Sequence, residues 1–200
     1  MRVTGFVLAG GKSSRMGQEK ALLPVGAQRL IDVAVQRLRP HVERVIVIGH
    51  AGNVEQFRGL PVEAVLTDLK PDCGPLMGLY TGLMRSETPW NLFVPCDMPW
   101  ISGRLLTRLL EQCGEDTEAV AGLHPVDGAQ PFPLLCRLEA GRTVGALLDR
   151  GERSLRAFLR CPQTRLVRVE EPELLRSFAN VNTPADYREL IDAYAVASRP

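Results

Sequence analysis

The sequence lacks the features of a secreted or membrane-spanning protein. Its first residues contain no apolar signal core followed by a small-residue cleavage site. No apolar run approaches the roughly 20 residues that a membrane-spanning helix needs. The five cysteines form no CxxC pair, and their odd number fits a reduced compartment better than a disulfide framework. We therefore expect a cytoplasmic protein that does not bind a membrane.

An excess of charge of either sign is also missing. The 24 lysines and arginines nearly balance the 23 aspartates and glutamates, and the net charge is +1. Such a balance argues against a broad nucleic-acid-binding surface, while it leaves room for a local basic pocket. The length of 200 residues and the hydrophobic content of 45% fit a single domain, spanning residues 1–200, with a buried core.

What the sequence does contain is a regular alternation of strand-like and helix-like segments. Apolar β-branched runs predict strands, and apolar residues at helical spacing predict helices. The expected strands cover residues 3–8, 45–48, 62–66, 91–95, 119–122 and 166–169. The expected helices cover residues 30–38, 75–85, 103–113 and 184–194, with an interrupted helical stretch over 138–160.

This alternation predicts an α/β fold with three layers, α/β/α, around a mainly parallel twisted sheet. Sheets of this kind bind ligands in the loops that follow the carboxyl ends of their strands. The places to search are therefore directly after Leu8, Ile48, Leu66, Pro95 and Gly122.

A glycine-rich loop follows the first strand. Gly10 and Gly11 allow backbone N–H groups to approach phosphate oxygens, and Arg15 and Lys20 can neutralise a triphosphate. Two familiar phosphate-binding patterns fail on spacing. A P-loop would need its first glycine at Phe6, and the pattern G-x-G-x-x-G fits neither glycine. The loop therefore predicts a triphosphate cradle of another type, with a simple flexible turn as the alternative.

Two aspartates follow later strands. Asp97, just beyond the strand that ends at Pro95, is placed to hold Mg²⁺ against triphosphate oxygens. The alternative is a turn-forming aspartate in front of Met98-Pro99. Asp68 is expected to contact the nucleotide, through the guanine edge or the ribose hydroxyls, unless it only caps a turn or the following helix.

The segment from Leu8 to Lys20 reads L-A-G-G-x-S-x-R-M-G-x-x-K, and it resembles the signature of the molybdenum cofactor guanylyltransferase family. Three later motifs narrow the resemblance, which runs almost from end to end: G-P-L-x-G after Asp68, C-D-x-P around Asp97, and N-V-N-T-P over residues 180–184. The resemblance implies a Rossmann-like nucleotidyltransferase fold. It also implies that GMP is transferred from GTP to the phosphate of molybdopterin, with release of pyrophosphate and with Mg²⁺ as cofactor.

The resemblance also implies the residues of the site. The catalytic residues would be Arg15, Lys20 and Asp97, with Asp97 as the metal ligand. Residues 1–100 would form the nucleotide-binding half and residues 101–200 the acceptor-binding half. GTP would be bound by Leu8, Ala9, Gly10, Gly11, Lys20, Asp68, Gly74, Gly78 and Asp97, and the molybdopterin acceptor by Gln130, Pro131, Asn180 and Asn182.

The base that the loop selects is open to two interpretations. Relatives that use CTP tend to read L-A-A-G, so Gly10 favours guanine because a missing Cβ leaves room for the larger base. Guanylyltransferases, however, often carry an asparagine at the end of the second strand, where this chain has Ile48-Gly49-His50. A cytidylyltransferase or sugar-1-phosphate nucleotidyltransferase of the same fold is therefore the alternative enzyme. A non-catalytic nucleotide-binding sensor is the alternative from another class.

The acceptor side is expected in two segments. Residues 127–133 predict a shaped loop, with a plain connector as an equally good interpretation. Residues 180–184 place two amides on one side of an extended segment, and Thr183 is a candidate cap for the helix opened by Pro184. The expected partners are GTP, molybdopterin, proteins that deliver the cofactor and molybdoenzymes that receive it, and the enzyme itself is expected to be a monomer.

Overall fold

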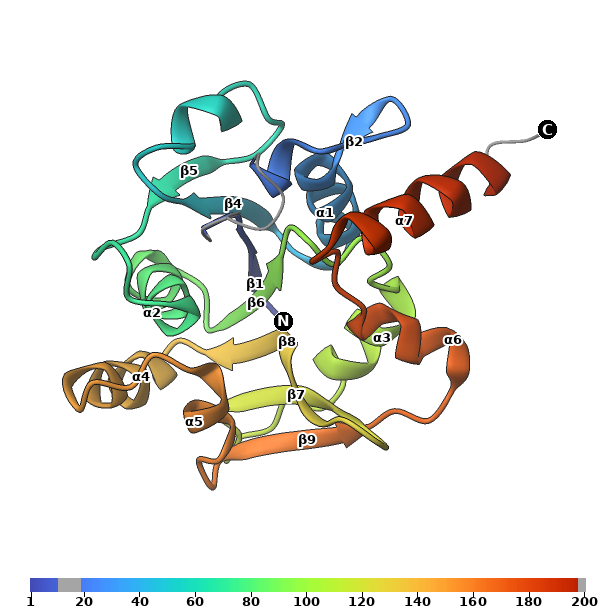
Figure 1. The fold of residues 1–200 in the computed structure, drawn as a ribbon. Coiled ribbons are helices and arrows are strands. Elements are labelled where there is room, and N and C mark those ends of the chain that lie inside the picture. Colours follow the sequence, from blue (N-terminus) through green and yellow to red (C-terminus); the bar gives the residue numbers. More distant parts are fainter. Residues whose placement is uncertain (11–18, 198–200) are drawn as a thin grey trace.

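The computed structural model describes residues 1–10 and 19–197. A seven-stranded sheet with the order β5-β4-β1-β6-β8-β7-β9 forms its centre (Figure 1). Among the described strands of this sheet, only β8 runs against its neighbours. The predicted α/β class with a mainly parallel sheet is confirmed. The strands are β1 (Val3–Leu8), β4 (Arg44–Gly49), β5 (Ala64–Thr67), β6 (Trp90–Pro95), β7 (Ala119–His124), β8 (Gly128–Arg137) and β9 (Thr164–Arg168).

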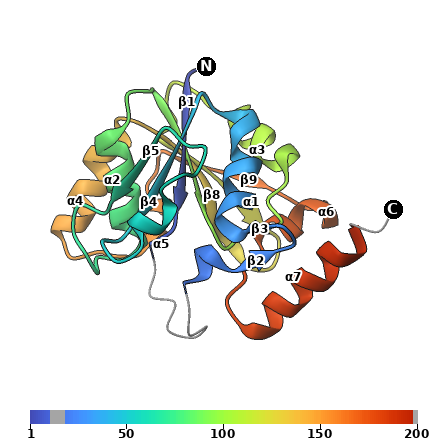
Figure 2. The same ribbon diagram turned by 90° about the horizontal axis from the view of Figure 1, so that it is seen from above.

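Helices cover both faces of the sheet, which gives three layers (Figure 2). Helices α1 and α3 lie on one face, and α2, α4 and α5 lie on the other. Strand β1 has side chains in both layers, because successive side chains of a strand point to opposite faces. The α-helices are α1 (Leu30–Leu38), α2 (Pro75–Arg85), α3 (Gly103–Leu110), α4 (Ala140–Asp149), α5 (Leu155–Leu159), α6 (Pro172–Leu175) and α7 (Pro184–Ala197).

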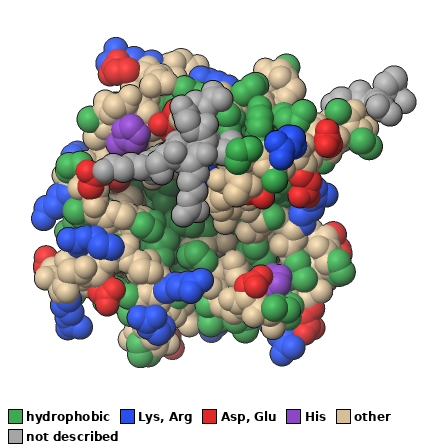
Figure 3. Space-filling model, viewed as in Figure 1, with side chains coloured by type: hydrophobic (Ala, Val, Ile, Leu, Met, Phe, Trp, Pro, Cys, Tyr) green, Lys and Arg blue, Asp and Glu red, His purple; other side chains and the backbone are tan. Residues whose placement is uncertain are grey.

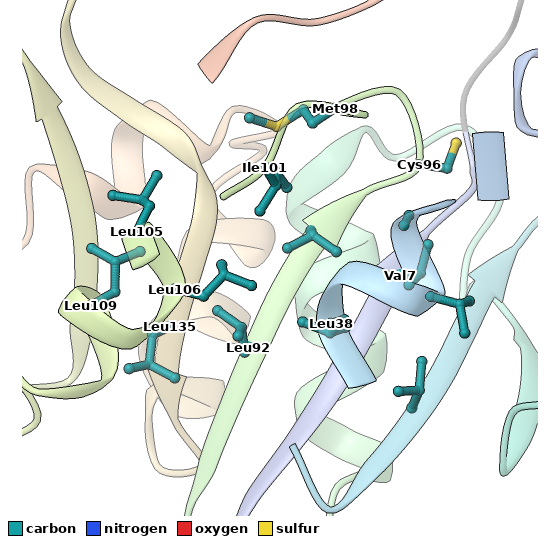
Figure 4. Close-up of a cluster of buried hydrophobic side chains, with 14 of the residues drawn as sticks. Val7, Leu38, Leu92, Cys96, Met98, Ile101, Leu105, Leu106, Leu109 and Leu135 are labelled. Carbon is teal, nitrogen blue, oxygen red and sulfur yellow. The ribbon is translucent and has the colours of Figure 1, made fainter. Parts of the chain in front are cut away.

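The core on the α1/α3 side reaches up to the edge of the sheet where the strands end. Helix α3 turns an apolar face of three leucines toward Leu92 of β6 and Leu135 of β8 (Figure 4). Beyond β6 the same cluster includes Cys96 and Met98, which are both buried. These two side chains flank Asp97, so the turn that carries this aspartate is anchored on both sides by the core.

The segment over residues 127–133 differs from the predicted shaped loop. Gly128–Arg137 is one continuous strand, β8, which forms an antiparallel hairpin with β7 and also pairs with β6. One glycine and two prolines made this strand look like a loop in the sequence, because proline is uncommon inside strands. Pairing on both sides overrides that local tendency. Strict alternation of strands and helices therefore fails at the hairpin of β7 and β8.

A small outer layer joins the C-terminal helix to the start of the chain. A two-stranded hairpin, β2 (Pro24–Val25) with β3 (Gln28–Arg29), was not predicted from the sequence. Helix α7 packs on it through a small cluster that includes Val25, Val181 and Leu190. The Tyr187 hydroxyl also donates a hydrogen bond to the Pro24 carbonyl at 2.6 Å. The last helix is thereby fixed beside the segment that carries Lys20.

Several predicted helix boundaries follow from local chemistry. The hydroxyls of Ser102 and Ser154 accept hydrogen bonds from the backbone N–H groups of Arg104 and Arg156, as N-caps do. Gly151 has a φ of 83°, a conformation that favours glycine at a helix end. The predicted boundaries err by a few residues elsewhere: the predicted helix 103–113 ends at residue 110, and the predicted strand 62–66 begins at residue 64.

Candidate active site

A pocket lies at the carboxyl ends of the parallel strands, on the face viewed in Figure 3, where the surface is hollowed and hydrophobic side chains form its floor. Four of the five places singled out from the sequence contribute to it, because β1, β4, β5 and β6 are neighbours in the sheet. The fifth, after Gly122, lies within strand β7 and contributes no lining residue. The described lining residues are Leu8, Ala9, Gly10, Glu19, Lys20, Ile48, Asp68, Gly74, Pro75, Gly78, Pro95, Cys96, Asp97 and Phe132.

Three predicted residues from distant parts of the chain meet at one side of this pocket. The Lys20 ammonium group donates to Asn182 Oδ1 at 2.7 Å and lies 3.3 Å from Asp97 Oδ2. Lys20 and Asp97 keep only 18% and 22% of their side-chain surface exposed, so their attraction is less screened than that of a surface pair. The glycine-loop end, the C-D-x-P turn and the N-V-N-T-P element therefore converge on one lysine.

The backbone fixes Asn182 in this place. The N–H of Val181 donates to the Asp97 carbonyl at 2.8 Å, which ties the C-terminal segment to the acidic turn. The Asp186 carboxylate accepts from the N–H groups of Asn182 and Thr183, and Thr183 Oγ1 accepts from the Asp186 N–H. The predicted cap by Thr183 is confirmed, and the segment is both a helix cap and a contact of Lys20.

The Asp97 carboxylate is poised for a cation. Burial raises its pKa above the ordinary value, and the adjacent Lys20 ammonium opposes that effect. Among the described residues, no group of three or more His, Cys, Asp or Glu side chains could hold a metal ion. A single carboxylate that shares a cation with substrate phosphates is the arrangement Mg²⁺ favours over a cage built by the protein alone. The residues present therefore fit a magnesium–triphosphate complex.

Cys96 lines the pocket beside Asp97 but is no candidate nucleophile. Its side chain is buried, and burial raises the pKa of the thiol far above the ordinary value. The thiol therefore stays protonated at neutral pH, and a protonated thiol is a poor nucleophile. Cys96 therefore contributes to the shape of the pocket and not to covalent catalysis.

Asp68 lies across the pocket from Asp97, at the end of β5. Its N–H donates to the Gly49 carbonyl, and its Oδ1 accepts from the buried Thr81 hydroxyl at 3.3 Å. A Cβ on Gly10 would lie 3.3 Å from Asp68 Oδ2, so glycine there keeps the carboxylate open to the pocket. Burial raises the pKa of Asp68, while the bond from Thr81 and the nearby His50 lower it.

Gly74 precedes helix α2 and Gly78 lies in its first turn, and both line the pocket. Gly74 has a φ of 73°, and a Cβ there would lie 3.0 Å from the Arg153 carbonyl. The Arg153 carbonyl accepts a hydrogen bond from the Leu76 N–H at 3.4 Å. A glycine at position 74 is thus required by conformation and by space, and the start of α2 is held by the segment that precedes α5.

The other acceptor residues predicted from the sequence lie apart from this cluster. Gln130 and Pro131 are half-buried in β8, where the Gln130 amide donates to the Gly128 carbonyl, but the residue of this strand that lines the pocket is Phe132. Asn180 and Asn182 are exposed on either side of the buried Val181, and the contact with Lys20 is made by Asn182. Gly11 and Arg15 lie outside the described residues.

One buried polar residue next to the pocket was missed from the sequence. Asn53 has no exposed surface, and its side chain bonds to the ends of both β1 and β4. Its neighbour His50 lies 3.4 Å from Glu19 and is partly exposed, as expected of a surface histidine. A motif search gives no signal for Asn53, although an asparagine soon after a buried strand is a candidate for this kind of backbone bond.

Comparison with known proteins agrees with this geometry. A family model described as a MobA-like NTP transferase domain matches residues 5–169. The chain belongs to the MobA-like NTP transferase family. A relative from Serratia proteamaculans, named molybdenum cofactor guanylyltransferase, is 34% identical over 192 residues and covers 92% of this chain and 91% of its own. A relative of the same name from Yersinia pestis is 31% identical over 187 residues, with 92% of each chain covered.

Solved structures share the MobA-like fold along nearly the whole chain. Molybdopterin-guanine dinucleotide biosynthesis protein A from Archaeoglobus fulgidus superposes with a TM-score of 0.80 at 21% identity, covering 96% of this chain and 99% of that one. A Mycobacterium tuberculosis protein in complex with manganese superposes with a TM-score of 0.72 at 20% identity, covering 96% and 100%. No described helix of the present chain is long and apolar enough to cross a membrane.

Proposed function

We propose that the protein transfers GMP from GTP to the terminal phosphate of molybdopterin, forming molybdopterin guanine dinucleotide and pyrophosphate. The observation that carries this proposal is the meeting of Lys20, Asp97 and Asn182 at one side of the pocket. The names of the relatives at 31–34% identity support the same reaction. The first half of the chain (1–100) holds the nucleotide in this scheme, and the second half (101–200) holds the acceptor.

The nucleotide takes the pocket between the ends of β1 and β5. The triphosphate lies against the Leu8–Gly11 backbone, with Arg15 and Lys20 as its cations. The base and ribose lie toward Asp68, Gly74 and Gly78, where missing side chains leave room. Asp68 accepts hydrogen bonds from the guanine edge or the ribose hydroxyls, which requires its carboxylate to be ionised.

The acceptor approaches from the side of the C-terminal segment. Asn180 and Asn182 present amide groups that suit the donor and acceptor edges of a pterin. From β8, Phe132 lines the pocket, and Gln130 and Pro131, the other predicted acceptor residues of this strand, are its neighbours in the chain. Because Asn182 contacts Lys20, the acceptor phosphate is brought next to the lysine that neutralises the triphosphate.

The reaction is an in-line displacement at phosphorus. An oxygen of the acceptor phosphate forms a bond to the α-phosphorus of GTP, and the bond from that phosphorus to the β-phosphate oxygen breaks. The electron pair leaves with pyrophosphate. Asp97 would hold a magnesium ion, which would supply positive charge to offset the negative charge that builds on the leaving group. Lys20 and Arg15 contribute in the same direction, while the pocket aligns the two phosphates.

Initial rates with purified molybdopterin and each of GTP, CTP, ATP and UTP test this proposal. We expect dinucleotide formation with GTP, and pyrophosphate release that depends on the acceptor. A product formed from CTP but not GTP would favour a cytidylyltransferase, for which Ile48-Gly49-His50 at the end of β4 is the specific argument. Tight nucleotide binding with no acceptor-dependent pyrophosphate release would favour a sensor.

A further inference from the structure

The two parallel strands that lead into the nucleotide pocket, β1 and β4, are joined at their ends by a side chain. Their last regular hydrogen bond runs from the Ala9 N–H to the Ile48 carbonyl at 2.7 Å. In a parallel ladder the next bond would run from the His50 N–H to the Ala9 carbonyl. Instead, the His50 N–H donates to Asn53 Oδ1 and Asn53 Nδ2 donates to the Ala9 carbonyl, both at 2.8 Å.

The carboxamide of Asn53 therefore replaces one rung of the ladder. It satisfies both backbone groups, as a peptide unit would, but it keeps them one amide width apart. The side chain has no exposed surface, so it reaches no ligand directly. A Cβ on Gly49 would lie 2.4 Å from Asn53 Oδ1, which shows how closely the backbone of β4 surrounds the inserted amide.

The inserted Asn53 carboxamide fixes the direction of the Ala9–Gly10 peptide, which leads into the glycine-rich loop. The Ala9 carbonyl points to Asn53, on the β4 side. Because a trans peptide is planar and its N–H is opposed to its carbonyl, the Gly10 N–H points to the other side, where β6 ends and Asp97 follows. That side is the part of the pocket assigned to the triphosphate.

We propose that Asn53 is a positioning residue of the nucleotide site, which holds the ends of β1 and β4 apart and presents the Gly10 N–H to the triphosphate. This inference rests on the proposed function, because it needs a nucleoside triphosphate in the pocket. Asn53 lies outside the sequence motifs, and its role would be to preorganise the Gly10 N–H as a donor to the phosphates.

Four variants of the full-length protein test this role: Asn53→Asp, Asn53→Ala, Gly49→Ala and Asn91→Ala. Asn53→Asp has nearly the same shape but no donor for the Ala9 carbonyl, and Gly49→Ala displaces the carboxamide without changing it. Asn91→Ala is the matched control. Asn91 is likewise fully buried and bonded to backbone and hydroxyl groups, but it lies in β6 beside Thr4 and Cys136, near the opposite end of the strand.

Binding of GTP with Mg²⁺, measured calorimetrically without acceptor, is the first readout, and steady-state kinetics and thermal unfolding accompany it. We expect the Asn53 and Gly49 variants to lose about tenfold in affinity and to raise KM for GTP equally, with kcat changed less than about threefold. Asn91→Ala should lower the unfolding temperature and leave the affinity unchanged. Folded Asn53 or Gly49 variants with wild-type affinity would overturn the inference alone. A wild-type protein that binds no nucleoside triphosphate would overturn the proposed function together with it.

Discussion

The two halves of the chain contribute to the pocket in different ways. In the first half, neighbouring parallel strands bring their following residues to one edge of the sheet, so Gly10, Asp68 and Asp97 are placed by the sheet itself. In the second half, the described contact with Lys20 comes from a non-regular segment that is tied to the Asp97 carbonyl and capped by Asp186. The proposed nucleotide side is thus built into the fold, whereas the proposed acceptor side is docked onto it.

The largest effect is expected at Asp97, which belongs to the first half and whose backbone carbonyl is bonded by Val181 of the second half. Asp97→Ala should lower kcat by about a thousandfold, because the developing charge on pyrophosphate loses its cation. Nucleotide binding measured in the absence of acceptor should be retained in part, because the loop contacts remain. The exposed Asp149→Asn on α4 is a matched charge control and should keep wild-type activity. Full activity of Asp97→Ala would rule out the metal role.

The two asparagines of the C-terminal segment should differ from each other. Asn182 contacts Lys20, so Asn182→Ala is expected to lower kcat about tenfold and also to raise KM for the acceptor. Asn180→Ala should raise only KM for the acceptor. In a double-mutant cycle, Asn182→Ala should have less effect when Lys20 is already alanine. Additive effects would mean that the contact with Lys20 contributes nothing to transfer.

On the nucleotide side, removing the Thr81 hydroxyl should change the pH dependence of GTP use. The bond from Thr81 lowers the pKa of Asp68, which burial raises, so Thr81→Val should raise that pKa further. As the pH is lowered, Asp68 then becomes protonated at a higher pH than in the wild-type protein. The acid limb of the kcat/KM profile for GTP should therefore shift to higher pH. Thr81→Ser retains the hydroxyl and should keep the wild-type profile.

Other charged groups also lie near the Asp68 carboxylate, and they are unchanged in both Thr81 variants. Among the described residues, His50 acts on it directly, and Glu19, Lys20 and Asp97 line the same pocket. Because the valine and serine variants share all of these charged groups, a difference between their pH profiles does not come from those groups, and a wild-type profile in Thr81→Ser assigns it to the hydroxyl. Identical profiles would show that Thr81 does not set the ionisation of Asp68.

The smallest effect is expected where the acceptor side is docked onto the hairpin. Tyr187→Phe removes one hydrogen bond to the Pro24 carbonyl and should lower the free energy of unfolding by about 1 kcal/mol. Urea denaturation measures this loss. GTP affinity should be unchanged, because Gly10, Asp68 and Asp97 are held by the sheet. A loss of GTP affinity in Tyr187→Phe would contradict the independence of the nucleotide side.

The sequence was informative where local chemistry decides the structure. Periodicity predicted the layers, and the rule for strand ends predicted that Asp68 and Asp97 would border one pocket, as they do. The strand β8 was missed because its proline and glycine content argues for a loop, while the pairing that stabilises it involves β6 and β7. Asn53 was missed because its role depends on the Ala9 carbonyl, which is distant in sequence.

A structure of the protein with Mg²⁺ and a non-hydrolysable GTP analogue tests the central claim most directly. We expect the metal within about 2.1 Å of an Asp97 carboxylate oxygen, the triphosphate along the Ala9–Gly10 backbone near Lys20, and guanine on the side of Asp68. The Asn180–Asn182 segment should remain open for the acceptor. A nucleotide bound away from Asp97, or a guanine ring placed against Asn180 and Asn182, would contradict the division of the site between the two halves of the chain.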